Sequence, residues 1–111
     1  MKIVTLRRSS EFRRVYSRGR VFSSPIVVMY AIKSRIKEVR VGISASKKVG
    51  NAVVRNRARR VMREAWFELV SRIPKGFDFV LSARANTVSV KTKDVQRKIF
   101  AFLKKFGLSG L

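Results

Sequence analysis

The chain has 111 residues, of which 27 are Lys or Arg and 6 are Asp or Glu, so its formal net charge is +21. Its hydrophobic content of 46% is too high for a disordered basic tail and predicts one folded domain over residues 1–111. The absence of cysteine excludes a disulfide framework and thiolate metal sites, and it agrees with a cytoplasmic location. No apolar run is long enough to span a membrane or to form the core of a signal peptide.

The large excess of positive charge points to a polyanionic partner. Charge of one sign repels itself in a compact chain, and a bound polyanion relieves that repulsion. Nucleic acid is therefore the expected partner. A membrane surface would attract the same charge, but the apolar runs are short and typical of strands, which disfavours this alternative.

The N-terminal half predicts one helix and two strands. A short helix begins at Ser9 or Ser10, either of which can cap it, and ends at Gly19. Its apolar residues recur with helical spacing: Phe12, Val15 and Tyr16. Residues 26–32, IVVMYAI, predict a strand that is apolar on both faces, and residues 39–45, VRVGISA, predict a half-buried strand.

The C-terminal half predicts a long helix, a strand and a final helix. The long helix covers residues 51–72, and residues 77–83, FDFVLSA, form the strand. The final helix is capped by Thr92 and ends at Gly107. This order of elements predicts an α+β fold, a small sandwich in which helices pack over one mixed sheet.

The helix over residues 51–72 is expected to have two different faces. In a helical projection, one arc holds the apolar residues that can pack on the sheet: Val54, Ala58, Val61, Met62, Ala65, Trp66 and Leu69. The opposite arc and its flanks are almost entirely arginine: Arg55, Asn56, Arg57, Arg59, Arg60 and Arg63. The planar guanidinium group matches phosphate oxygens and stacks on bases, so this face predicts a surface for nucleic acid.

The residues before this helix extend the predicted anion-binding surface. Lys47 and Lys48 precede a corner formed by Gly50 and Asn51. Backbone N–H groups at the start of the helix add donors where an anion would bind. Phosphate is therefore favoured at this corner as well as along the helix.

A solvated charged helix is the ordinary alternative for such a basic run. A merely soluble helix usually mixes Lys with Glu in i, i+4 pairs, whereas here only Arg60 and Glu64 have that spacing. The one-sided arginine pattern therefore favours a polyanion. Phe67 projects among the arginines, and a stacking platform is the one functional interpretation for it.

The sequence offers little of the chemistry that a protein nuclease needs. It has no histidine and no cysteine for proton transfer or metal binding. Its acids lie on different predicted elements, and only Glu64 and Glu68 share a helix at i, i+4, which is too little for a two-metal site. We expect no catalytic residue, no protein metal site and no activity from the protein alone.

Four segments resemble the bacterial ribonuclease P protein subunit over nearly the whole chain. The central one is KKVGNAVVRNRARRVMRE, in which Arg55, Asn56 and Arg57 form the "RNR" signature of that family. The others are LRRSSEFRRVYSRG, RVGISASKKVGNA and FVLSARAN. The resemblance implies a two-layer α/β sandwich like the second domain of ribosomal protein S5. It would have three helices, a mixed four-stranded sheet and a left-handed βαβ crossover.

The resemblance also implies a function that involves RNA. The family's protein binds a large catalytic RNA, and the holoenzyme removes the 5′ leader of precursor tRNA with Mg²⁺ held mainly by RNA. Residues that would contact the catalytic RNA are Lys47, Lys48, Asn51, Arg55, Asn56, Arg57, Arg59, Arg60 and Arg63. Residues that would bind the single-stranded leader are Phe12, Tyr16 and Tyr30.

Some alternatives remain open from the sequence. The three leader residues could be ordinary core aromatics, above all Phe12. A structural or ribosomal RNA-binding protein without an enzymatic role would use the same basic helix. A DNA-binding module is disfavoured because no helix-turn-helix pair precedes that helix. The region after Ala85 matches the family less well, so Lys91 and Lys93 receive no role.

Overall fold

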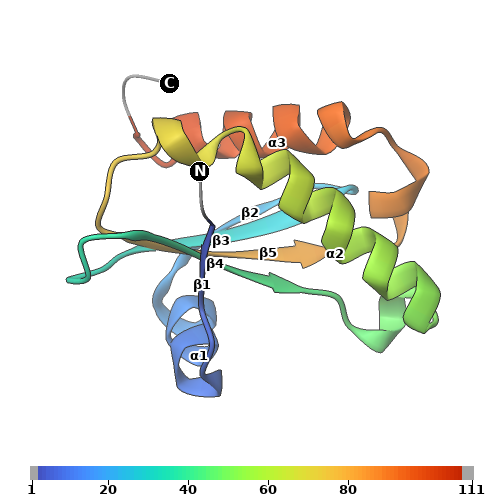
Figure 1. Cartoon of the computed structure of the whole chain (residues 1–111), viewed down its shortest axis with the longest axis horizontal. Helices are drawn as coiled ribbons and strands as arrows, with labels where there is room; N and C mark the ends of the chain where they lie inside the picture. Colours follow the sequence, from blue (N-terminus) through green and yellow to red (C-terminus); the bar gives the residue numbers. More distant parts are fainter. Residues whose placement is uncertain (1–2, 109–111) are drawn as a thin grey trace.

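The computed structural model describes residues 3–108, which form three α-helices and one five-stranded sheet (Figure 1). In chain order the elements are β1 (Val4–Thr5), α1 (Ser9–Arg18), β2 (Arg20–Ser23), β3 (Val27–Lys33), β4 (Val39–Ser44), α2 (Ala52–Phe67), β5 (Phe77–Ala83) and α3 (Thr92–Lys105). Short 3-10 turns lie between some of them: η1 (Lys47–Val49), η2 (Val70–Arg72) and η3 (Ala85–Ser89).

The sheet is mixed, as predicted, but it has five strands and the expected number of four is wrong. The strand order is β1-β4-β5-β3-β2, with β1, β4 and β5 parallel and β3 antiparallel to both β5 and β2. The two edge strands carry almost no sequence signal. β1 has two residues, and β2 has four residues of which only Phe22 is buried, so neither shows a strand periodicity.

Helices cover both faces of the sheet, which differs from the predicted two layers. α2 and α3 pack on one face and α1 packs on the other (Figure 1). The first face carries the large core cluster, which includes Met29, Val41 and Phe79. The second face carries a smaller cluster in which Val80 packs with Val15 of α1. The sequence predicted that the strand β3 is apolar on both faces. A helical layer on each side of the sheet covers these two faces.

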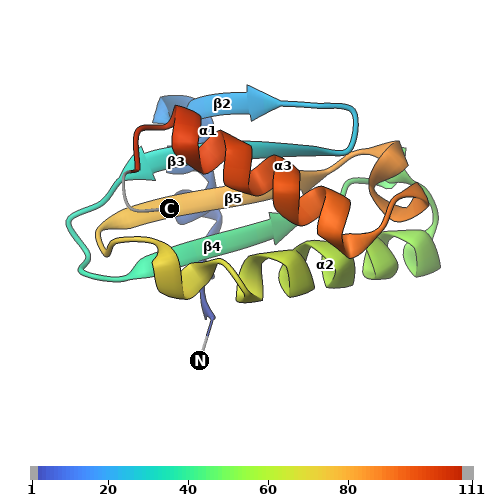
Figure 2. The same cartoon turned by 90° about the horizontal axis from the view of Figure 1, so that it is seen from above.

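The arginine-rich helix connects two neighbouring parallel strands. β4 leads through η1 into α2, and the chain then returns to β5, which pairs with β4 (Figure 2). This is the βαβ unit that the family resemblance implies, and its left hand stays a prediction. The buried residues of α2 belong to the predicted apolar arc: Ala58, Met62, Ala65 and Trp66. The arc therefore holds α2 on the sheet, with the arginines outside.

Acidic side chains, not the predicted hydroxyls, cap α1 and α3. Glu11 Oε1 accepts a hydrogen bond from the Arg8 N–H at 2.8 Å, and Asp94 Oδ2 accepts one from the Lys91 N–H at 3.2 Å. A carboxylate three residues inside a helix satisfies free N–H groups and favours the positive end of the helix dipole. The predicted caps are instead helical residues: Ser9, Ser10 and Thr92.

α2 ends at Phe67, five residues before the predicted end of the long helix at Arg72. The chain continues as the 3-10 turn η2, and Leu69, Val70 and Ile73 are all buried. A 3-10 turn winds more tightly than an α-helix and changes which residues face the core. The apolar residues after Phe67 therefore predict a helical turn, but they do not show whether that turn is α-helical or 3-10.

Gly42 lets α1 approach the sheet closely. A Cβ atom at this position would lie within 2.6 Å of Phe12 Cζ, so the Phe12 ring packs directly on the backbone of β4. Gly42 pairs with Val80, and Val80 pairs with Tyr30, so the three residues lie in one row across the sheet. The row forms the floor on which the α1 aromatics rest.

We predict that Gly42→Ala destabilises the fold by about 1 to 3 kcal/mol, because an added methyl group in a packed contact forces neighbouring atoms to move. Urea unfolding of the single variants and of the double variant with Phe12→Ala measures this. In the Phe12→Ala background the methyl group has room, so Gly42→Ala should then cost little. An equal cost in both backgrounds would show that the Phe12 contact is not the reason.

Candidate nucleic-acid interface

The corner before α2 is built from Gly50 and Asn51. The Asn51 Oδ1 atom accepts a hydrogen bond from the Val54 N–H at 3.0 Å and caps the helix. Gly50 has φ +154°, and a Cβ atom there would lie 2.9 Å from the Val54 Cβ atom. The Gly-Asn pair therefore fixes the direction in which α2 leaves the sheet. Lys47 and Lys48 are exposed on η1, directly before this corner.

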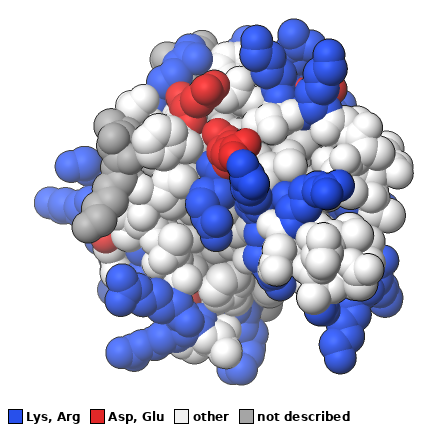
Figure 3. Space-filling view, turned by 45° about the vertical axis from the view of Figure 1, so that its right-hand side comes forward, with Lys and Arg blue, Asp and Glu red and all other residues white. Residues whose placement is uncertain are grey.

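Exposed guanidinium groups line the outer side of α2. Arg57, Arg60 and Arg63 are exposed, and none of the ion pairs among residues 3–108 involves Arg57 or Arg63. Arg60 Nε lies 3.2 Å from Glu64 Oε1, the pair that the spacing predicts. Figure 3 shows Lys and Arg side chains in several groups over one face of the molecule, with few acidic side chains among them. The surface has the charge and the donors to bind phosphates.

Three of the residues that were predicted to contact RNA are partly buried or bond to other parts of the protein, which the helical projection did not show. Arg59 Nη1 donates to Asn56 Oδ1 at 2.9 Å, and Arg59 Nη2 lies 3.5 Å from the Ala45 carbonyl oxygen. Arg55 is half-buried, and its Nε atom is buried with no hydrogen-bond partner among the described residues. Arg55 and Arg59 are half-buried and Asn56 is bound by Arg59, so the set of fully outward arginines is smaller: Arg57, Arg60 and Arg63.

The predicted leader residues come together on the other face of the sheet. The Tyr16 ring meets the Tyr30 ring edge to face, with centroids 4.8 Å apart, and the Phe12 ring lies 6.5 Å from Tyr16. Tyr16 is 38% exposed, whereas Phe12 and Tyr30 are half-buried. Phe12 and Tyr30 pack against the small core cluster, and Tyr16 lies against both of their rings with its own ring exposed.

An open hollow of about 660 Å³ lies beside these rings. Its lining residues are Arg7, Ser9, Phe12, Arg13, Tyr16, Ser17 and Ser44. Tyr30 is not among them, although its ring contacts that of Tyr16, which does line the hollow. Arg7 and Arg13 were not predicted as site residues, although their places beside the α1 aromatics in sequence are the signal that could have identified them. A hollow with aromatic and cationic walls fits unpaired bases and their phosphates.

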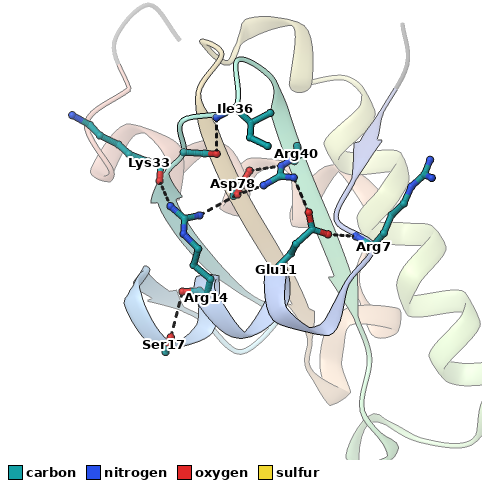
Figure 4. Close-up of polar contacts among 9 residues, drawn as sticks. Arg7, Glu11, Arg14, Ser17, Lys33, Ile36, Arg40 and Asp78 are labelled. Carbon is teal, nitrogen blue, oxygen red and sulfur yellow. Dashed lines mark hydrogen bonds and ion pairs between the residues drawn. The ribbon is translucent and has the colours of Figure 1, made fainter.

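An ion-pair network centred on the buried Asp78 holds α1 over the sheet (Figure 4). Arg40 of β4 donates from Nε to Asp78 Oδ1 at 2.8 Å and from Nη2 to Asp78 Oδ2 at 2.7 Å. Its Nη1 atom donates to Glu11 Oε2 at 2.8 Å. Arg14 Nη1 adds a bond to Asp78 Oδ2 at 3.3 Å, and Arg14 Nη2 reaches the Lys33 carbonyl oxygen at 2.9 Å. Asp78, a single acid in an apolar strand, was the sequence signal for this network.

The network shifts the ionisation of two of its members. The pKa of Glu11 is lowered mainly because its carboxylate accepts hydrogen bonds from the backbone N–H groups of Arg8 and Arg7, with Arg40 adding to the effect. The pKa of Arg40 is raised, first by its hydrogen bonds to Asp78. Both shifts favour the charged forms that make the bonds.

Residues 3–108 contain neither a membrane-spanning helix nor a cluster of metal-binding side chains. No helix there is long and apolar enough to cross a membrane. In the same residues, no three side chains of the types His, Cys, Asp or Glu gather closely enough to hold a metal ion. Glu11 and Asp78 approach each other through Arg40, whose positive charge already occupies the space between them.

The fold and its arginine-lined helix define a small RNA-binding subunit of the ribonucleoprotein class. The sequence matches the Ribonuclease P family over residues 1–107. The chain belongs to the family of bacterial ribonuclease P protein components. It is a subunit of the ribonuclease P holoenzyme, an endoribonuclease that matures the 5′ ends of tRNA.

Relatives and solved structures agree with this assignment. A ribonuclease P protein component of Clostridium acetobutylicum is 41% identical over 110 residues, which cover 97% of this chain and 92% of the relative. One from Clostridium botulinum is 38% identical over 109 residues, with coverage of 97% and 98%. The structure of the Staphylococcus aureus RNase P protein superposes with a TM-score of 0.81 at 30% identity, covering 96% of this chain and 98% of the other.

We predict that Glu11→Gln lowers the free energy of unfolding at pH 7 by about 0.3 to 2 kcal/mol, the range for a charge at a helix terminus, because the amide oxygen can still accept a backbone N–H but the negative charge is lost. Folded Glu11 has a lowered pKa, so its stabilisation is present above its ordinary pKa of 4.5 and is lost as pH falls through the folded value. The stability gap between the natural chain and the variant should therefore narrow below about pH 4.5.

Urea unfolding at a series of pH values measures this gap. Glu38→Gln is the matched control, because Glu38 is exposed and its side chain takes part in none of the ion pairs of residues 3–108. A gap that stays constant with pH, or an equal gap for the control, would contradict the role given to Glu11.

Proposed function

We propose that the two surfaces bind two different RNA segments. The outer side of α2 and its lead-in bind the catalytic RNA of the holoenzyme through Lys47, Lys48, Asn51, Arg55, Asn56, Arg57, Arg59, Arg60 and Arg63. The aromatic cluster on the opposite face binds the single-stranded 5′ leader of precursor tRNA through Phe12, Tyr16 and Tyr30. The observation that carries this proposal is the separation of an arginine surface from an aromatic surface by the sheet.

The α2 surface is suited to folded RNA. Arg57 and Arg63 are exposed and unpaired among the described residues, so no internal ion pair has to break before they bind phosphate. Each neutralised phosphate releases condensed counterions, which makes the affinity strongly dependent on salt. Membership of the ribonuclease P family favours its catalytic RNA over the ribosomal or other structural RNA that the sequence left open.

The aromatic hollow is suited to a leader of any sequence. Every base has a π-face, so stacking on Tyr16 and Phe12 does not require a particular base. Arg7 and Arg13 line the same hollow and add contacts for the leader phosphates. The closeness of rings and cations distinguishes this hollow from a purely structural cluster.

Catalysis itself is assigned to the RNA. The protein supplies binding and orientation, and the Mg²⁺ ions that the holoenzyme requires are held mainly by RNA oxygens, which suit this hard cation. The chain contributes few carboxylates, and two that approach each other, Glu11 and Asp78, are bound to Arg40. We place this assembly in the cytoplasm, in agreement with the absence of cysteine.

We predict that Arg57→Ala and Arg63→Ala each weaken binding of the catalytic RNA and reduce the slope of log K against log salt by about 0.7 to 0.9, the value for one lost phosphate contact. Filter binding at several salt concentrations measures the slope. Arg97→Ala removes the same charge from a side chain on α3 that is 79% exposed and serves as the control. Unchanged slopes for both α2 variants would show that Arg57 and Arg63 make no phosphate contact and that this side of α2 is an ordinary solvated surface.

We predict that Tyr16→Ala weakens binding of precursor tRNA to the holoenzyme by about 1 to 3 kcal/mol, the contribution of one stacked base. Mature tRNA, which lacks the leader, should bind as before. Tyr16→Phe keeps the ring and should bind precursor normally. Titration of each reconstituted holoenzyme with both tRNAs tests this, and Tyr30→Ala extends it to the second ring. Equal weakening for precursor and mature tRNA in a folded variant would exclude a leader site here.

A further inference from the structure

Phe67 is an exposed aromatic residue that the two proposed surfaces leave unexplained. It is the last residue of α2, and 47% of its surface is exposed. It lies one helical turn after Arg63 and two turns after Arg60, so it continues the arginine surface towards the C-terminal end of α2. A large apolar ring at this position has no role in the core.

A hollow of about 460 Å³ opens beside Phe67. It is lined by Ile3, Arg63, Glu64, Phe67, Glu68 and Thr92, which come from the start of the described chain, α2 and the start of α3. Gln96 of α3 donates to Glu68 Oε2 at 2.7 Å and to the Ala65 carbonyl oxygen at 3.3 Å. These bonds join α3 to α2 beside the hollow and hold its wall in place.

The charges around the hollow fit a base better than a row of phosphates. Glu64 and Glu68 would repel phosphate, but among residues 3–108 each makes only one side-chain hydrogen bond, to Arg60 and Gln96 respectively. A carboxylate can accept about four hydrogen bonds, so both can still accept an N–H from a base edge. Arg63 supplies one cation at the rim for the phosphate of the same nucleotide.

We propose that this hollow binds one unpaired, amino-bearing base of the catalytic RNA. The base stacks on Phe67, its amino group donates to Glu64 or Glu68, and its phosphate binds Arg63. Adenine, cytosine and guanine carry such an amino group, whereas uracil does not. The proposal rests on the assignment of the α2 surface to the catalytic RNA, and it extends that surface from phosphate contacts to base recognition.

The surrounding charge favours RNA over a protein as the occupant. The hollow adjoins Arg60 and Arg63 on a chain with a net charge of +21, which repels a second copy of itself and attracts a polyanion. The two carboxylates at the rim, Glu64 and Glu68, would repel an acidic peptide. A base with an amino group uses the ring, the cation and the carboxylates together.

The test compares Phe67→Ala, Phe67→Trp and Val21→Ala in binding to the catalytic RNA across a salt series. We expect Phe67→Ala to bind about 5- to 100-fold more weakly, because a stacking contact is lost, with an unchanged salt slope because no phosphate contact is lost. Phe67→Trp should bind normally. Val21→Ala removes an apolar side chain that is 54% exposed on β2, at the opposite edge of the sheet from β4, and should also bind normally.

Chemical probing of Watson–Crick edges in the RNA adds a second measurement. One adenine, cytosine or guanine should be protected by the natural protein and by Phe67→Trp, and exposed in the complex with Phe67→Ala. The same protection should weaken with Glu64→Gln and Glu68→Gln together. Melting of each free variant checks that the exposed substitution leaves the fold intact.

The outcomes separate this inference from the assignment on which it depends. If Arg57→Ala weakens RNA binding and Phe67→Ala does not, the base site is wrong and the phosphate surface stands. If the natural protein does not bind the catalytic RNA, the proposed function itself fails. Loss of self-association or of binding to another protein in Phe67→Ala, with normal RNA binding, would assign the hollow to a protein partner and overturn the inference.

Discussion

The shared guanidinium group of Arg40 is the contact on which the rest of the arrangement depends. It joins Asp78 of β5 to Glu11 of α1, and Glu11 in turn caps the helix that carries Phe12 and Tyr16. Asp78 is 1% exposed, so removing Arg40 would leave a buried carboxylate with only the 3.3 Å bond to Arg14. The position of the aromatic surface therefore depends on Arg40, a strand residue that belongs to neither of the two proposed RNA-binding surfaces.

Five of the six acidic side chains bond to other residues of the fold, and with so few acids most arginines are available to an external partner. Glu11 and Asp78 bind Arg40, Glu68 is bound by Gln96, and Asp94 caps α3. Glu64 pairs with Arg60, the one ion pair on the outer side of α2. With 27 basic residues against 6 acidic ones, most positive side chains have no internal partner to satisfy them. A chain of this composition folds compactly in isolation, but most of its positive charge is neutralised only when a polyanion binds.

The sheet keeps the two proposed RNA sites apart while connecting them rigidly. α2 lies on one face through its apolar arc, and α1 lies on the other through Phe12, Val15 and Gly42 (Figure 1). β4 belongs to both, since it leads into α2 at one end and carries Arg40 and Gly42 beneath α1. A protein held on a catalytic RNA by α2 would thus present its aromatic hollow in a fixed direction, which is what orientation of a leader requires.

The sequence by itself determined the α+β class, the three long strands, the three helices, the apolar and arginine sides of α2 and the family. These features depend on local periodicity and composition, which are visible along the chain. Only the tertiary structure decided the two edge strands, the second helical layer, the short end of α2 and the half-buried state of Arg55. Asp78 signals a buried acid, but its partner Arg40 and the Phe12 contact with Gly42 could not be predicted, because these contacts join residues 38 and 30 positions apart. Such contacts depend on strand register and on how the helices dock, and the residue pattern of a single segment predicts neither of these.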